Sequence, residues 1–196
     1  MDEEMGFLHK IPEIEDVQCA WILLSYSAVP RANHIVRVLP PALSHDYAAL
    51  HDQAIWECFC KLLGTENLMA DQLARQVATL PARCGGLGLR DAGRTADGAY
   101  WASWVDALPV LTKKLPGVAA AIVASLEREA DPAPLACMKE LKRCSSRLLA
   151  VGARDLPTWR QAADGATAPQ PPSDRFAADP GEWRRSWQFH ACPFLE

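Results

Sequence analysis

The chain has 196 residues, of which 49% are hydrophobic and 22% are charged. This composition supports a folded core and excludes a wholly disordered chain. The net charge of −4 argues against strong autonomous binding to nucleic acid, because such proteins are usually basic, although it leaves room for a local basic face.

Helical signals begin near the N-terminus. Apolar residues at helical spacing predict a helix over residues 14–28, and the carboxylates of residues 13–16 suit its first turn. Pro30 cannot continue that helix but can begin another, so we expect a second, short helix over residues 31–39. The prolines at positions 40 and 41 stop it.

Two further helices are predicted before the glycine-rich stretch. Ser44 suits the N-cap of a third helix that runs to residue 63 and ends at Gly64. A fourth helix is expected over residues 67–79. The third helix would bury one stripe of side chains: Tyr47, Leu50, Ala54, Cys58 and Leu62.

Three glycines within four residues, Gly85, Gly86 and Gly88, interrupt the helical periodicity. They predict a structural turn with positive φ or a close backbone approach. A phosphate-binding loop is disfavoured, because neither the dinucleotide fingerprint nor the Lys-Ser or Lys-Thr of a P-loop is present.

Helical patterns return over residues 91–107, 117–130 and 135–150. Residues 165–181 are rich in Ala, Pro, Asp and Gln and predict a flexible linker. The end of the chain, residues 182–196, is apolar again, and we expect an amphipathic helix that is truncated.

Cysteine usage and the N-terminal sequence indicate the compartment. Seven cysteines without paired spacing favour reduced thiols. The first ten residues are acidic where a signal peptide is basic, and no apolar run reaches the ~18 residues that a membrane span needs. We predict an intracellular protein, cytoplasmic or nuclear, that is neither secreted nor inserted in a membrane.

Arg31, His34 and Arg37 would form one cationic edge of the second helix, because residues three apart are neighbours on a helix. Arginine forks bind phosphate oxygens, so this edge suits the backbone of a nucleic-acid duplex. A solvated helix face with surface ion pairs is the alternative. Four further cations form a basic strip, for which a solvated face is favoured over phosphate contact: Lys139, Lys142, Arg143 and Arg147.

Other chemistry finds weaker support. His45, Asp46, His51 and Asp52 suggest a metal site, but on a helix His45 and His51 point to different sides and only His45 and Asp52 share a face, whereas zinc needs about four convergent ligands. No local signature of a serine or cysteine nucleophile occurs. We predict no metal, no cofactor and no catalytic residue. Trp21, Trp56, Trp101 and Trp104 are interpreted as core residues and not as platforms on which bases stack.

Two segments together resemble the region that follows the polymerase palm in reverse transcriptases of non-LTR retrotransposons. The first carries Asp16, Gln18, Ala20, Leu23, Leu24, Pro30, Arg31, His34, Arg37, Pro40 and Pro41. The second carries Leu80, Pro81, Gly85, Gly86, Leu87, Gly88, Leu89 and the run from Ala99 to Trp104.

The resemblance implies a helical thumb, which holds the template–primer duplex, and the connection that follows it. The family's paired aspartates, which hold two metal ions in the palm, are absent from this chain, as are its Cys/His knuckle and nuclease carboxylates. Only Arg31, His34 and Arg37 carry over, as duplex contacts. The missing palm of the same polyprotein is then an expected partner.

We therefore expect an all-α fold, an irregular multi-helix bundle with a Gly-rich turn and a Pro-rich flexible linker near the C-terminus. The expected segments are a thumb- and connector-like domain (1–130), a basic helical extension (131–164), the linker (165–181) and the C-terminal helix (182–196). The expected function is that of a non-catalytic, thumb-like fragment that positions a duplex. The alternatives are a stand-alone helical protein–protein interaction module, whose C-terminal helix docks on a partner, and, more remotely, a cysteine-dependent enzyme.

Overall fold

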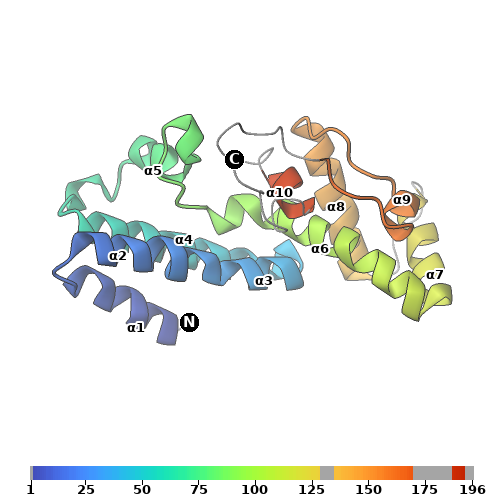
Figure 1. Ribbon diagram of the computed structural model, residues 1–196, viewed down its shortest axis with the longest axis horizontal. Coiled ribbons are helices and arrows are strands. Elements are labelled where there is room, and N and C mark those ends of the chain that lie inside the picture. Colours follow the sequence, from blue (N-terminus) through green and yellow to red (C-terminus); the bar gives the residue numbers. More distant parts are fainter. Residues whose placement is uncertain (1, 129–134, 170–186, 193–196) are drawn as a thin grey trace. The chain divides into compact units, whose positions relative to one another are not determined.

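The computed structural model describes residues 2–128, 135–169 and 187–192, and within these ranges the chain forms helices and no strands (Figure 1). The prediction of an all-α fold is confirmed. The α-helices are, in chain order, α1 (Asp2–Lys10), α2 (Val17–Leu23), α3 (Ala32–Val38), α4 (Pro41–Leu62), α5 (Gln72–Thr79), α6 (Ala92–Lys114), α7 (Pro116–Glu127), α8 (Ala136–Ala150), α9 (Trp159–Ala163) and α10 (Trp187–Ala191).

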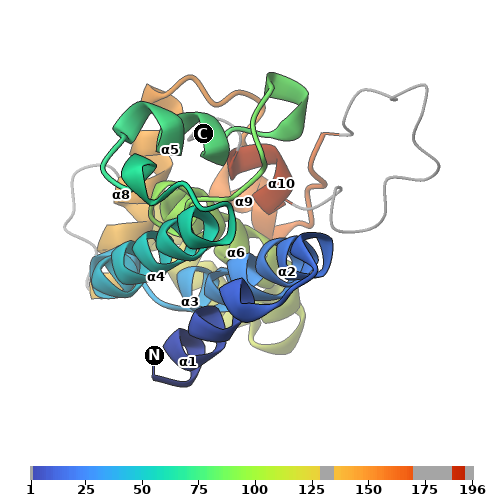
Figure 2. The ribbon, with the colours of Figure 1, turned by 90° about the vertical axis from the view of Figure 1, so that its left-hand side faces the viewer.

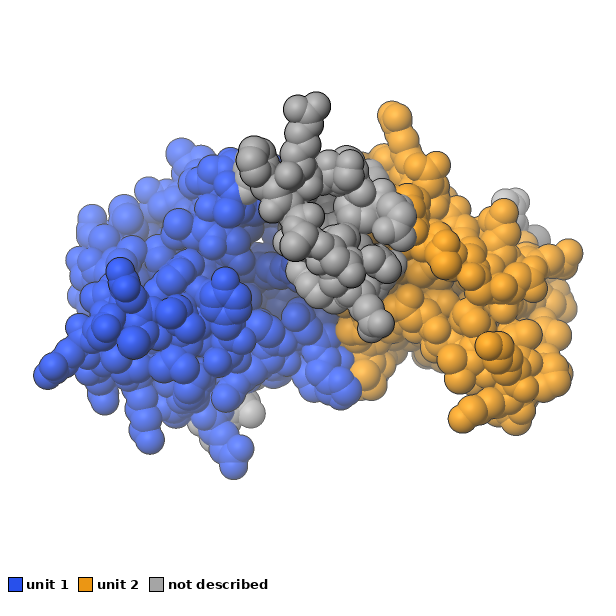
Figure 3. Space-filling model, viewed as in Figure 1, with its two compact units in different colours: residues 1–36, 43–95, 196 blue, residues 37–42, 96–195 orange. Residues whose placement is uncertain are grey.

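The chain divides into two compact units, coloured separately in Figure 3. Unit 1 contains residues 1–36 and 43–95, and unit 2 contains residues 37–42 and 96–195, with residue 196 grouped with unit 1. The boundaries of these units differ from those of the four segments expected from the sequence. The four segments remain a prediction.

The first predicted helix starts later than expected and does not stop at Pro30. The Asp16 carboxylate accepts hydrogen bonds from the backbone N–H groups of Gln18 (2.8 Å) and Cys19 (3.1 Å), so the helix begins at the following residue. A π-helical turn over Leu24–Ala28 and a 3₁₀ turn over Val29–Arg31 then connect α2 to α3. Proline fits there because a first-turn N–H has no intrahelical acceptor.

Ser44 is not the N-cap of α4, contrary to the sequence prediction. The helix begins at Pro41, which places the Ser44 hydroxyl inside the first turn, where it is buried without a hydrogen-bond partner. Leu50 is also misassigned, because its side chain is 58% exposed, whereas Ala54 and Cys58 are buried as predicted. Gly64 follows the helix with a φ of +62°.

Unit 1 is built around α4. Figures 1 and 2 show α1 and α5 on opposite sides of this helix. The Cys58 thiol of α4 donates to the Leu8 carbonyl oxygen of α1 (3.4 Å), and the Phe59 ring meets the Trp21 ring of α2 edge-on at 6.0 Å. These contacts define one hydrophobic core.

Unit 2 has a core of its own, centred on α6 and α8. Trp101 is 1% exposed and meets the rings of Trp159 (6.4 Å) and Trp187 (5.8 Å). Leu141 and Leu148 of α8 complete the packing and are fully buried. Trp56 and Trp101 are core residues, as predicted, whereas Trp21 and Trp104 are partly buried and pack against the two cores.

The helix predicted over residues 91–107 extends to Lys114 and contains Pro109. Packing accounts for the difference, since Leu108, directly before the proline, is fully buried in the core of unit 2. The expected linker, residues 165–181, lies outside the described residues from 170 onward. In its described part, Ala168 is buried and the Ala166 carbonyl accepts a hydrogen bond from the Trp187 indole N–H (3.1 Å).

Candidate nucleic-acid interface

Arg31 is exposed and held by an aromatic ring. It ends the 3₁₀ turn over Val29–Arg31, and its guanidinium carbon lies 4.3 Å from the centroid of the Phe7 ring of α1. A cation over an aromatic face is attracted by the ring quadrupole, so this contact orients the side chain without neutralising its charge. Arg31 therefore remains available to an anion.

His34 lies one helical turn beyond Arg31 and is also exposed. Ala32, which lies between them in the sequence, and Val36, two residues after His34, are each only 1% exposed. This pattern turns the two polar side chains to the outer side of the segment while small apolar residues face the core.

Arg37 has a different environment. Its guanidinium donates to the Asp106 carboxylate (3.1 Å) and to the Gln188 side-chain oxygen, and its own carbonyl accepts from the Ser103 hydroxyl (2.7 Å). All of these groups belong to unit 2. The side chain is 29% exposed, so Arg37 serves the packing of unit 2 and is less available to an anion than Arg31.

Most of the predicted basic strip of α8 is occupied within unit 2. Arg143 and Arg147 each donate to the Asp97 carboxylate at 2.7 Å, and the side chain of Asp97 is 3% exposed. Lys142 donates to the Arg128 carbonyl (2.6 Å), and the side chains of Lys139, Arg143 and Arg147 are exposed. The strip is therefore a partly solvated face whose two arginines also pair with Asp97.

Sequence reasoning missed Asp97. The feature of the sequence that could have identified Asp97 is a single carboxylate between two small residues, Ala96 and Gly98, on the buried side of a helix. A buried charge requires partners, and two arginines four residues apart on α8 satisfy that requirement. The function of Asp97 is therefore structural.

The shifted cysteine pKa values do not support a reactive thiolate. Burial raises the pKa of Cys58 to about 11, and burial followed by the nearby Asp97 charge raises the pKa of Cys144 further. The pKa of Cys60 is raised by burial, and that of the exposed Cys19 is raised by the Asp16 charge. Each of these shifts lowers the population of the nucleophilic thiolate.

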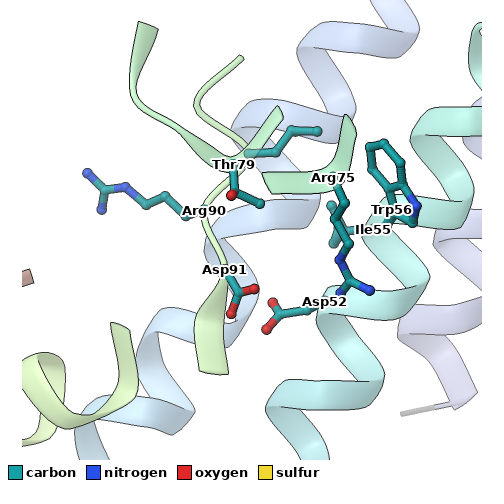
Figure 4. Close-up of a pocket in the computed structure, with 8 residues that line it drawn as sticks. Asp52, Ile55, Trp56, Arg75, Thr79, Arg90 and Asp91 are labelled. Atoms are coloured by element: carbon teal, nitrogen blue, oxygen red, sulfur yellow. The ribbon is translucent and has the colours of Figure 1, made fainter. Parts of the chain in front are cut away.

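Asp52 and Asp91 form a second unexpected site. Their carboxylates point toward each other, whereas the Arg90 side chain points away (Figure 4). Asp52 accepts hydrogen bonds from the backbone N–H groups of Ala92 and Gly93, both at 2.8 Å, and so caps the N-terminus of α6 from α4. Burial, and then the Asp91 charge, raise the pKa of Asp52 to about 7.

The space beside this pair is too small for a substrate. The cavity has a volume of about 10 Å³, which corresponds to roughly one water molecule. Arg75, one of the lining residues, donates instead to the Gln53 side-chain oxygen (2.8 Å). The acid pair is a capping site of the fold.

The four groups of the proposed metal motif separate in the structure. His45 and Asp46 are exposed and contact each other (3.2 Å), His51 is buried against the Glu4 carboxylate (2.7 Å), and Asp52 caps α6. In the part of the chain that the structure describes, no three His, Cys, Asp or Glu side chains gather as metal ligands would.

No protein-family model, curated protein or solved structure matches the chain. Among residues 2–128, 135–169 and 187–192, no helix combines the length and the apolar content that crossing a membrane requires. The case for a function therefore rests on the exposed side chains and on the resemblance described above.

Proposed function

We propose that this chain is a non-catalytic, thumb-like part of a retroelement reverse transcriptase, and that it positions a template–primer duplex through phosphate contacts. The observation that carries the proposal is the joint exposure of Arg31 and His34 on the outer side of one helical segment. That segment also bears the Pro-Arg-x-x-His part of the resemblance.

The contacts would be independent of nucleotide sequence. Arg31 is held over the Phe7 ring and offers a guanidinium fork to phosphate oxygens, and His34 adds a second donor one turn away. Arg37 pairs with Asp106, so we expect it to contribute less to phosphate binding than Arg31. The palm of the same polyprotein would supply the metal-binding carboxylates, so this chain performs no chemistry itself.

The charge of unit 1 sets the expected affinity. Residues 1–36 and 43–95 carry seven Lys and Arg side chains against twelve Asp and Glu side chains. An acidic surface repels phosphates, so binding by this chain alone should be weak, and with so few phosphate contacts its affinity should fall only gradually as salt is added.

The test is fluorescence anisotropy of a labelled RNA–DNA hybrid duplex, titrated with the full chain over a series of salt concentrations. Arg31→Gln removes the charge while keeping most of the side-chain stem. We expect the slope of log K against log salt to flatten by about one for each phosphate contact that is lost. His34→Gln should have a smaller effect, because glutamine keeps an N–H donor at this position.

Lys61→Gln is the matched control, because Lys61 is an exposed cation of unit 1 in the last turn of α4. It should leave the slope within experimental error of the wild type. Equal slopes for wild type and Arg31→Gln would remove the basis of the proposal, provided that circular dichroism shows both proteins folded.

The alternative of a stand-alone module that docks through its C-terminal helix is less well supported. In the described part of that helix, Trp187 and Ala191 are 5% and 0% exposed and belong to the core of unit 2. Side chains that are already buried in their own unit are not available to a partner.

A further inference from the structure

An apolar groove opens on unit 1, away from the residues of the proposed duplex contact. It lies between α2 and the C-terminal turn of α4 and has a volume of about 440 Å³. The groove is lined by Val17, Gln18, Trp21, Ile22, Leu62 and Leu63.

The groove exposes large apolar side chains in one place. Val17, Ile22 and Leu63 are 49%, 54% and 48% exposed. Trp21 is partly buried, and its ring packs edge-on against the Phe59 ring with 6.0 Å between the ring centroids. Scattered exposed apolar residues are normal on a protein surface, but a continuous set around a preformed hollow is typical of a binding site.

Carboxylates outnumber cations among the exposed residues next to the lining residues in the sequence. Glu13, Glu15 and Asp16 lead directly into Val17, and Glu66 follows Leu63 by three residues, whereas Lys61, directly before Leu62, is the one exposed cation among these neighbours. Unit 1 as a whole is acidic, with twelve carboxylates against seven cations in residues 1–36 and 43–95. An occupant must therefore satisfy an apolar floor and an acidic border together.

We propose that this groove binds an amphipathic helix of a protein partner, with apolar side chains one turn apart and lysine or arginine beside them. Helices dock in grooves of this kind by placing residues at i and i+3 or i+4 against the floor. The cations of such a helix face Glu13 and Glu15, which favours its encounter and fixes its orientation.

The charges disfavour the other occupants. A second copy of the chain would bring the acidic border of one groove toward the acidic unit of the other. At this groove, an anionic membrane surface or a nucleic acid would be repelled by the neighbouring carboxylates Glu13, Glu15 and Glu66. The inference does not depend on the duplex proposal, because it uses other residues and another class of partner.

A display library of helical 16-residue peptides provides the probe, selected on the full chain and counter-selected on the Ile22→Asp variant. The enriched peptides should share apolar residues at helical spacing and an excess of Lys and Arg over Asp and Glu. Failure to enrich any peptide over the counter-selection, or enrichment of peptides without that positive charge, would overturn the proposal.

The consensus peptide is then synthesised with a fluorescent label and its Kd is measured. Ile22→Asp should raise the Kd by about tenfold or more. The apolar side of the bound helix would remove water from the new carboxylate without offering it a hydrogen-bond partner, which is costly. Val17→Asp is a second variant that preserves the fold, because an acid in the first turn of α2 is favourable to the helix. Leu73→Asp is the matched control, because Leu73 is 69% exposed on α5 of the same unit and lies outside the groove.

The acidic border has its own control pair. Glu15→Lys should weaken the peptide by about threefold at low salt and reduce the salt dependence of its on-rate, whereas Glu3→Lys, an equal charge reversal on α1, should do neither. Equal effects of Ile22→Asp and Leu73→Asp, or concentration-dependent dimers that Ile22→Asp abolishes in sedimentation, would contradict the assignment. Saturable binding to anionic vesicles through the same residues would contradict it as well.

Discussion

Asp52 and Asp97 are buried carboxylates that accept hydrogen bonds from another part of their own unit. Asp97 receives two arginine side chains of α8, each at 2.7 Å, and Asp52 receives two backbone N–H groups of α6 at 2.8 Å. Their electrostatic situations differ, because Asp97 faces positive charges, whereas Asp52 faces the carboxylate of Asp91. Neither carboxylate belongs to the proposed interface, and both determine how helices meet.

The raised pKa of Asp52 predicts a pH dependence of stability. The folded state keeps a proton on this carboxyl up to about pH 7, whereas the unfolded state loses it near the ordinary value of 3.8. The folded state thus binds more protons in that window, so the free energy of unfolding falls as pH rises through it. Asp52→Asn should remove this contribution, worth at least about 1 kcal/mol.

The measurement is thermal unfolding of wild type and variant at about pH 5 and about pH 8, where the contribution is largely present and lost, respectively. Asp46→Asn is the control, because Asp46 lies on the same helix with a fully exposed side chain. If Asp52→Asn shows the same change in Tm between the two pH values as the wild type, the pH dependence arises elsewhere.

At the scale of the elements, the glycine-rich turn depends on backbone conformations and a close contact that favour glycine. Gly85 and Gly88 have φ values of +83° and +71°, a region that favours glycine. The Leu80 carbonyl accepts a hydrogen bond from the Gly88 N–H (2.9 Å), and Gly86 packs directly on Leu80. The turn therefore folds back on the end of α5, and its close approach depends on the missing side chain of Gly86.

Gly86→Ala should lower the free energy of unfolding by about 2 kcal/mol, since the added methyl group would overlap the Leu80 carbonyl oxygen and the backbone must move. The matched substitution is Gly117→Ala in the first turn of α7, where an added Cβ meets nothing within 4 Å. That variant should be neutral or more stable by up to about 1 kcal/mol. Urea unfolding distinguishes them, and equal stabilities of the two variants would refute the role of the turn.

At the scale of the whole molecule, the residues that the structure describes form two hydrophobic cores, one in each unit. Each core combines segments far apart in sequence, such as α1 with α4 in unit 1 and α6 with α10 in unit 2. Separate cores allow parts of a protein to open with different free energies.

Leu148→Ala should therefore act mainly within unit 2. Removal of a fully buried leucine from α8 should cost about 2–5 kcal/mol and speed amide exchange in α8 and α9. Exchange in α4 should change less. Hydrogen-exchange mass spectrometry provides the comparison, and Leu149→Ala, whose side chain is 59% exposed on the same helix, is the control. An equal loss of protection in α4 would show that the two cores unfold as one.

The sequence predicted helices well where their signals are local. The bounds of α7 and α8, Pro116–Glu127 and Ala136–Ala150, lie within a few residues of the prediction. It predicted less well where packing competes with local preference. The helix through Pro109 continues because Leu108 is buried, and Leu50 is exposed although its spacing suits the buried stripe.

The candidate site was predicted only in part, and for a physical reason. Residue types and helical spacing place Arg31, His34 and Arg37 on one edge of one segment, but they do not identify the groups that face each of these side chains. Only the structure shows Arg37 beside Asp106, and Arg143 with Arg147 around Asp97. Such pairs join residues that are 46 to 69 positions apart, beyond the range of any helical period.

By itself, the sequence determined the all-α class, the order of most helices and the places where glycine and proline interrupt them, because these depend on backbone preferences within a few residues. Tertiary structure decided which charges are free, which carboxylates are buried and where apolar side chains remain exposed. Those properties depend on long-range packing, which brings α2 beside the end of α4 and Asp52 to the first turn of α6.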